Sequence, residues 1–314
     1  MNCFKIYDLT VLSEINLPSA LPVDDHDMSD SEPVVIRCSD LKEEYLESIQ
    51  AKKMSCDNGF ATYRITEQIW LVNIYRIGMF RISSGKLIEY MKTVDVDASE
   101  LEQWILNYCI SIIMIQRGRI VLHGSGLINN GSMILISGES GSGKSTLADA
   151  LLAEGMGFAA DDSVCVRTYC ESGSSEIKVQ GIGAYPIRRL CDDLLTDEEK
   201  KCMIYQPDGD KKKYAYNMRH SWPEGYSELK YLFIIQPGNS KEVSISKVEG
   251  MDKLKAIIQC LYKRGSYVEK GLSAQLMTEI VMIADNILVY YINRPLGIMS
   301  VEEQKKQVIG IISQ

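Results

Sequence analysis

The residues with the clearest chemical meaning form the glycine-rich segment GESGSGKS, Gly138–Ser145, which matches the pattern G-x-x-x-x-G-K-[ST] in full. Glycines at this spacing let the backbone fold tightly, so that several amide N–H groups and the start of a helix converge on one anion. Lys144 can then reach the β- and γ-phosphates of a nucleotide, and the Ser145 hydroxyl can bind Mg²⁺. The segment therefore predicts a site for ATP with Mg²⁺. The residues expected to contact the nucleotide are Gly138, Ser140, Gly141, Ser142, Gly143, Lys144, Ser145 and Thr146.

Two adjacent carboxylates, Asp161 and Asp162, follow the short apolar run Phe158–Ala160, which is typical of a buried strand. Like charges side by side raise the pKa of one member of such a pair, which moves that carboxylate toward useful basicity. One aspartate could then accept a proton from a hydroxyl nucleophile, while the other supports the metal. The alternative is a solvated turn that ends the strand, and the spacing alone leaves both interpretations open.

His123 lies in the segment Leu122–Gly124, in the hairpin that precedes the glycine-rich loop. A lone histidine on a strand is more often a hydrogen-bonded core residue than a catalytic one. From the residues alone we therefore favour a core role for His123 and keep a catalytic role as the alternative.

Four motifs in this order resemble the HPr kinase superfamily, whose nucleotide-binding fold is shared with phosphoenolpyruvate carboxykinase. They are Gln116–Gly118, Leu122–Gly126, the glycine-rich loop and Ala159–Asp162. The resemblance implies a mixed α/β (α+β) fold, namely a P-loop kinase core of the HPr kinase/phosphoenolpyruvate carboxykinase type with a β-rich N-terminal domain. It further implies that Asp161 deprotonates the acceptor hydroxyl, that His123 lies near the transferred phosphoryl group, and that Asp162 supports Mg²⁺.

Downstream, Tyr185–Arg188 resembles a proline-containing arginine motif of HPr-kinase-like relatives, which adds Arg188 to the expected nucleotide contacts. Arg189 and the run Lys211–Lys213 could complete a phosphate clamp, although a lysine run is usually a solvated surface. One stretch departs from the family pattern. Where HPr kinases carry Glu-Ile-Arg-Gly-Leu-Gly, this chain reads KVQGIG at Lys178–Gly183, which argues against HPr as the substrate and against phosphorolysis.

The N-terminal part is similar to one subgroup, the HPr-kinase-like proteins of peptide natural-product gene clusters. The motifs that carry this similarity are Ser13–Pro18 and Ile77–Ile82 with Gly85. That subgroup includes kinases that phosphorylate a serine of a ribosomally made precursor, such as a lasso peptide. Because relatives form multimers, the resemblance leaves a homo-oligomer open.

The elements that must position these residues follow from hydrophobic periodicity and turn signals. We expect a β-rich domain over residues 1–97 and an ATP-binding catalytic domain over 98–314, with a linking helix at 98–117 that begins at a Ser99…Glu102 capping box. An Asn130-Gly131 turn predicts a hairpin that leads into the glycine-rich loop. Helices are expected at Ser145–Glu154, Asp252–Lys263, Ser273–Ala284 and Val301–Ile312, the last behind a Ser300…Glu303 capping box. Further strands are expected at Val164–Arg167, Ile177–Val179, Tyr231–Ile235, Val243–Val248 and Ile287–Ile292.

Bulk properties narrow the class of protein. A net charge of −8 over 314 residues argues against a nucleic-acid-binding surface, which would need a basic stripe. No uninterrupted apolar run approaches the roughly 18 residues of a membrane-spanning helix, and the first residues lack a signal-peptide pattern. The nine cysteines contain no C-x-x-C pair, which is typical of reduced thiols. We therefore expect a cytoplasmic protein that binds neither nucleic acid nor membrane.

Three functions fit these residues. The first is a kinase that moves the γ-phosphoryl group of ATP to an aliphatic hydroxyl, preferably a serine of a ribosomal peptide precursor. The second is a kinase of free serine or of another small hydroxyl compound. The third is a regulator that binds a nucleotide without catalysis, and it is disfavoured because a pure binder needs neither the aspartate pair nor His123.

Overall fold

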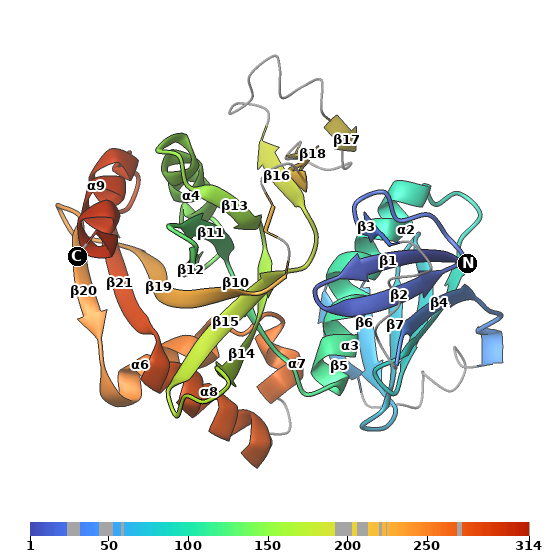
Figure 1. The fold of residues 1–314 in the computed structure, drawn as a ribbon. Coiled ribbons are helices and arrows are strands. Elements are labelled where there is room, and N and C mark those ends of the chain that lie inside the picture. Colours follow the sequence, from blue (N-terminus) through green and yellow to red (C-terminus); the bar gives the residue numbers. More distant parts are fainter. Residues whose placement is uncertain are drawn as a thin grey trace. The chain divides into compact units, whose positions relative to one another are not determined.

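The computed structural model describes residues 1–23, 32–43, 53–57, 60–191, 203–205, 213–219, 222–223, 225–268 and 272–313. The chain has a mixed α/β fold with several sheets and forms two compact units (Figure 1). The first unit is built chiefly from Met1–Arg119, and the second from Ile120–Met203, Lys213–Arg264 and Leu272–Gln314. The helical segment expected to link two domains therefore belongs to the first unit, and the second unit begins with the strand that carries His123.

The first unit contains one sheet in which nine described strands follow the order β3-β1-β2-β4-β9-β8-β7-β6-β5. Burial alternates along strands such as β2, so one face of the sheet packs inward. A tight turn at Ser84 and Gly85, both with positive φ, joins β8 to β9. The strands are β1 Asn2–Ile6, β2 Leu9–Ser13, β3 Leu21–Pro22, β4 Val34–Cys38, β5 Lys53–Asp57, β6 Phe60–Arg64, β7 Ile69–Ile74, β8 Gly78–Ser83 and β9 Leu87–Lys92.

A continuous helical segment follows this sheet in the chain: α2 Ala98–Trp104, the π-helical turn η2 Ile105–Cys109 and α3 Ile110–Gln116. The predicted capping box is wrong. Asp97 is the N-cap, and its carboxylate accepts the Ser99 backbone N–H at 2.7 Å. Glu102 is buried and accepts the Ser19 backbone N–H at 2.8 Å, so a long-range hydrogen bond takes the place of the expected local one.

The second unit is built on a sheet of order β10-β14-β15-β19-β12-β11-β13, with β21 beside β19 and β20 beside β21. Strands β12, β19 and β21 run parallel to one another. The strands are β10 Ile120–His123, β11 Ser125–Asn129, β12 Ser132–Gly138, β13 Gly157–Ala160, β14 Ser163–Cys170, β15 Ile177–Gly183, β19 Ser227–Gly238, β20 Ser244–Val248 and β21 Leu288–Pro295. A small separate sheet has the order β16-β18-β17, from Ile187–Cys191, Lys213–Asn217 and Met203–Tyr205.

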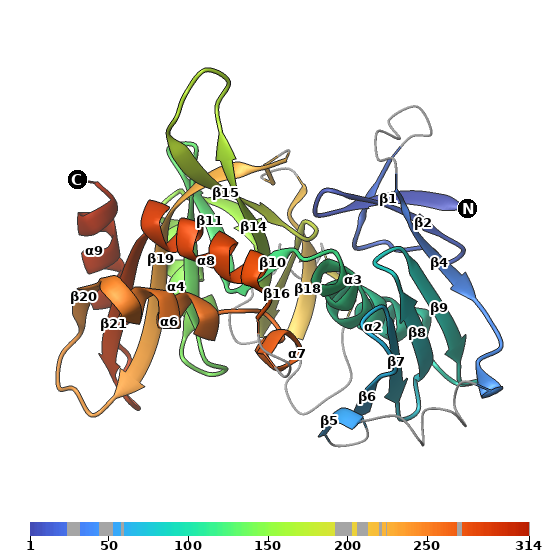
Figure 2. The ribbon, with the colours of Figure 1, turned by 90° about the horizontal axis from the view of Figure 1, so that it is seen from below.

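Helices lie on both faces of the second unit's main sheet. Helices α4 Lys144–Ala153 and α9 Val301–Ile312 pack together on one face, and α6 Gly250–Gln259 and α8 Ala274–Asn286 lie side by side on the other (Figures 1 and 2). The short helix α7 spans Arg264–Val268. Strand β12 is buried from Met133 to Ser137, with four consecutive apolar residues, because both of its faces are covered, as expected of a central parallel strand.

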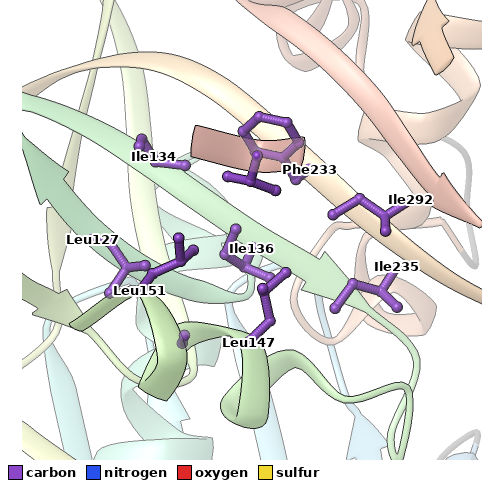
Figure 3. Close-up of a cluster of buried hydrophobic side chains, with 10 residues drawn as sticks. Leu127, Ile134, Ile136, Leu147, Leu151, Phe233, Ile235 and Ile292 are labelled. Atoms are coloured by element: carbon purple, nitrogen blue, oxygen red, sulfur yellow. The ribbon is translucent and has the colours of Figure 1, made fainter. Parts of the chain in front are cut away.

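The core beneath α4 fixes the strand end that leads into the glycine-rich loop. Leu147 and Leu151 of α4 pack on Ile136 of β12, and Phe233 and Ile292 extend this cluster to the neighbouring parallel strands (Figure 3). All five side chains are fully buried. A close-packed interior of this kind tolerates little displacement, so the end of β12 and the start of α4 are held in fixed positions.

The predicted helix over Val301–Ile312 is confirmed in both of its bounds, but its capping box is wrong. Ser300 caps no backbone N–H with its side chain; its hydroxyl instead accepts the Gln304 side-chain amide at 3.1 Å. Glu302 and Glu303 lie in the first turn, where carboxylates favour a helix N-terminus. None of the helices in the described part of the chain combines the length and the apolar character needed to cross a membrane.

Candidate functional site

The glycine-rich loop is a tight turn between β12, which ends at Gly138, and α4, which begins at Lys144. Gly138, Gly141 and Gly143 have φ values of 144°, 78° and 102°, a region that other residues rarely adopt. The Ser142 backbone N–H donates to the Glu139 carbonyl at 3.1 Å, which closes the turn. The glycine spacing noted in the sequence therefore coincides with a tight turn directly ahead of a helix, a position at which backbone amides can bind an anion.

Gly138 leaves no room for a side chain. A Cβ at this position would lie 2.7 Å from the Ser142 Oγ and 2.8 Å from the Ile235 carbonyl oxygen. We therefore expect Gly138→Ala to weaken nucleotide binding at least about tenfold, because the left-handed strain of about 1–2 kcal/mol adds to this clash. Titration with a fluorescent ATP analogue measures the effect. Gly173 also has a positive φ, but a Cβ there would meet open space, so Gly173→Ala is the control and should bind the nucleotide normally. Equal nucleotide affinities of the two variants would contradict the prediction.

Three side chains reinforce or fill the loop. The Lys144 ammonium group donates to the Gly138 and Glu139 carbonyls, at 2.9 and 3.0 Å, and so folds over the loop. Arg294, at the end of β21, donates from Nε to the Ser142 carbonyl at 2.8 Å. The Ser142 hydroxyl is buried and has no hydrogen-bond partner among the described residues. A phosphate bound in the turn could satisfy such a buried hydroxyl. Arg294 was not singled out by the sequence because it lies far from the motif in the chain.

The aspartate pair forms the turn between β13 and β14 and is fixed by the strands beside it. The Gly124 backbone N–H donates to the Asp162 carbonyl at 3.0 Å, and the Ser125 hydroxyl donates to the Asp161 carbonyl at 3.0 Å. The Asp161 carboxylate itself accepts the Arg189 backbone N–H at 3.0 Å. The turn is therefore a hydrogen-bonded part of the sheet edge, and both carboxylates start from a well-fixed backbone.

His123 connects the aspartate turn to the glycine-rich loop. Its Nδ1 lies 3.0 Å from the Asp162 carbonyl oxygen and 3.4 Å from the Asp162 carboxylate, and its own carbonyl accepts the Ser137 hydroxyl at 2.6 Å. A carbonyl can only accept, so Nδ1 carries the proton and Nε2 is the free acceptor of the neutral ring. Burial lowers the pKa of His123, Asp162 opposes this effect, and the nearby Lys144 ammonium reinforces it.

The lowered pKa of His123 has a consequence for stability. The unfolded chain takes up a proton near pH 6.5 while the folded chain resists it, so the contribution of His123 to stability is complete above that pH and is lost as the pH falls from there through the lower pKa of the folded state. We expect His123→Asn, whose amide can also donate to the Asp162 carbonyl, to lose less stability between pH 7.5 and 5.5 than the wild type does. Urea unfolding at both pH values measures this; an equal loss in both proteins would contradict the prediction.

Two neighbouring arginines on β16 serve different partners, because successive side chains of a strand point to opposite faces. Arg188, the predicted nucleotide contact, forms an ion pair with Asp149 on α4. The Arg189 guanidinium instead donates to the Tyr185 hydroxyl at 3.1 Å. Although burial alone would lower the pKa of Arg189, Tyr185, Asp161 and Asp162 raise it. Arg189 is therefore the arginine beside the aspartate pair. Lys211 and Lys212 lie outside the described residues.

Two cavities border the glycine-rich loop. The larger one, of about 630 Å³, includes the loop residues Gly138–Ser140 and His123 in its wall. The smaller one, of about 310 Å³, borders the loop at Gly141, Gly143 and Thr146 and reaches Arg294 and the start of α9. The remaining residues of the larger cavity are Ser137, Ile234, Ile235, Gln236, Pro237, Gln259, Cys260, Leu261, Tyr262, Lys263 and Arg264. His123 and the loop thus share one cavity.

Comparisons with known proteins add little beyond this geometry. No family model matches the sequence, and no curated protein is similar to it. Among solved structures, the chain is similar to the HPr(Ser) kinase/phosphatase from Coxiella burnetii, with 13% identity and a TM-score of 0.31 over 62% of this chain and 93% of the other. So loose a superposition carries no functional argument.

Proposed function

We propose that the second unit is a kinase that transfers the γ-phosphoryl group of ATP to an aliphatic hydroxyl. The observation that carries this proposal is the position of His123, which contacts Asp162 directly, lines the same cavity as Gly138–Ser140 and has its pKa lowered by burial and, to a smaller extent, by Lys144. His123 thus connects the Asp162 carboxylate with the glycine-rich turn and with the Lys144 cation. Phosphoryl transfer asks the protein mainly for alignment and charge neutralisation, and these groups supply both.

Each residue has a role in this proposal. The loop amides and Lys144 bind the β- and γ-phosphates, and Asp161 orients and deprotonates the acceptor hydroxyl. Ser145 and Asp162 offer hydroxyl and carboxylate oxygens, the hard ligands that Mg²⁺ prefers, so the donor set fits this ion. When bound, Mg²⁺ neutralises charge on the phosphates. The unpartnered Ser142 hydroxyl supports the assignment of the loop to a phosphate ligand.

For the acceptor we infer a serine, preferably in a ribosomal peptide precursor. The sequence resemblance of the N-terminal part to kinases of peptide gene clusters supports the peptide, and a cavity of about 630 Å³ has room for one or a few residues. Free serine is the second candidate because the same cavity would hold it whole. A regulator that binds a nucleotide without catalysis would need neither the aspartate pair nor His123.

The test is a transfer assay with γ-labelled ATP and Mg²⁺, in which the protein is given a serine-ended peptide, free serine or no acceptor. We expect label on the peptide at a rate well above the rate of ATP hydrolysis without acceptor. Label on free serine alone would replace the peptide by the small acceptor. ATP binding without transfer to any acceptor, water included, would contradict the kinase proposal and favour the regulator.

A further inference from the structure

The segment that follows α6 forms one wall of the larger cavity. Its backbone is hydrogen-bonded to β10: the His123 N–H donates to the Cys260 carbonyl at 2.7 Å, and the Tyr262 N–H donates to the Val121 carbonyl at 2.8 Å. These bonds extend the sheet edge up to Tyr262. The next residue, Lys263, is therefore delivered to the cavity by a fixed backbone rather than by a free loop.

Lys263 adopts a conformation that lysine rarely takes. Its φ is 53°, in the left-handed region, which costs a residue with a side chain about 1–2 kcal/mol. Strain of this kind persists only where the surrounding structure fixes it, and it occurs frequently at ligand sites. The observation points to a function for this turn and for the cation that it places in the cavity wall.

The side chains of this wall form a row. The Lys263 ammonium lies 5.1 Å from the Tyr262 ring centre, and the Tyr262 ring stacks on His123 with 5.9 Å between centroids. Burial lowers the pKa of Lys263, and the Asp162 carboxylate opposes that effect. The cation therefore lies within electrostatic reach of the aspartate turn, on the same wall as His123.

The charges on the cavity wall favour an anion. Its described lining residues include the cations Lys263 and Arg264 and the carboxylate Glu139. A monoanion suits this balance better than a dianion, because Glu139 and the nearby Asp162 would repel additional negative charge. Ammonium and guanidinium groups together are a common way to bind a carboxylate.

We propose that Lys263 binds a carboxylate that the acceptor carries next to its hydroxyl, so that Lys263 determines acceptor specificity. The proposal rests on the kinase function proposed above and narrows its substrate to a serine with a free α-carboxylate, either the free amino acid or the last residue of a peptide. Recognition of this carboxylate orients the hydroxyl relative to the phosphate loop and discriminates against serines inside a chain.

The test measures binding and needs no turnover. Calorimetry with a non-hydrolysable ATP analogue and Mg²⁺ compares free serine with serinamide, and a serine-ended peptide acid with its amide. In one of these two pairs we expect the acid to bind at least about tenfold more tightly than the amide. The amide cannot form the charge-assisted hydrogen bond that the carboxylate forms. The pair that shows the preference identifies the source of the carboxylate.

Two variants locate the effect. Lys263→Asn removes the ammonium group, and asparagine tolerates the left-handed backbone. In this variant the acid should bind no more than about threefold more tightly than its amide, while the affinity for the ATP analogue stays unchanged. Lys241→Asn, at an exposed bend, is the matched control and should keep the full ratio.

Equal affinities of the wild type for acid and amide, including no measurable binding of either, would overturn the proposal. So would an unchanged ratio in Lys263→Asn, or a loss of nucleotide affinity in that variant that equals its loss of acid binding. If the acid preference and its dependence on Lys263 are found but no transfer occurs in the labelled assay, the kinase function fails while the carboxylate site stands.

Discussion

Lys144→Ala is expected to abolish ATP turnover, with a loss of at least about 10³-fold in kcat/KM. The lysine ammonium already lies against the Gly138 and Glu139 carbonyls, at the mouth of the loop, and in the proposed complex it moves onto the β- and γ-phosphates. A preorganised cation at the position where charge develops contributes several kcal/mol to a phosphoryl transfer. ATP consumption and labelled-product formation, measured side by side, report this loss.

Lys306→Ala, an exposed lysine on α9, is the control for Lys144→Ala and should be fully active. Retention of more than about a tenth of wild-type activity by Lys144→Ala would contradict the assignment of the loop as the phosphate site. Water in place of the ammonium group cannot supply the same stabilisation of the charge that develops during transfer. A melting temperature close to that of the wild type is needed to attribute the loss to chemistry, and we expect it because Lys144 is not part of the core.

Asp161→Asn is expected to keep nucleotide binding and to lose transfer by about 10²–10⁴-fold, the range of general-base catalysis. Asparagine retains a side-chain oxygen that can accept the Arg189 backbone N–H, so the turn should keep its geometry while the proton acceptor is lost. The measurement pairs calorimetric ATP affinity with single-turnover transfer of labelled phosphate. The control is Asp285→Asn on the exposed surface of α8, which should change neither quantity.

Normal transfer by Asp161→Asn would contradict the base assignment. The structure supplies the next candidates in that case: Asp162, which lies beside His123, and the Nε2 acceptor of His123 itself. Loss of ATP affinity in Asp161→Asn would instead place this carboxylate in nucleotide or metal binding and would exchange the roles proposed for the two aspartates.

The sequence predicted best those features whose cause is local. The Asn130-Gly131 turn appears with both residues at positive φ and joins β11 to β12. The glycines of the phosphate loop take left-handed conformations, and the helix over Val301–Ile312 has the predicted bounds. Backbone conformation at a glycine and apolar periodicity along a helix depend on a few neighbouring residues, so a single sequence is enough to read them.

The features that the sequence did not predict depend on distant partners. Glu102 has the right spacing for a capping box, but it bonds to Ser19 instead, which no local pattern indicates. The small sheet of β16, β17 and β18 was not expected, because its strands carry weak alternation and pair across long separations in the chain. Tertiary hydrogen bonds overrode local preference in both cases.

The candidate site divides in the same way. The loop and the aspartate pair were visible as motifs, whereas the choice between Arg188 and Arg189 required knowledge of which face of β16 points to α4. Lys263 and Arg294 carried no signal in the sequence, since each reaches the site from a different strand end or turn. His123 was expected as a core residue or a catalytic one; it is half-buried and lines the cavity beside the loop.

The most direct test of the central claim is a crystal structure of the protein with Mg²⁺ and a non-hydrolysable ATP analogue. We expect the triphosphate on the backbone amides of Gly138–Ser145, with an Asp161 or Asp162 carboxylate within hydrogen-bond reach of the γ-phosphate region, either directly or through one water molecule. A triphosphate on the loop with both carboxylates turned to bulk solvent, beyond about two water layers from the γ-phosphorus, would contradict phosphoryl transfer at this site.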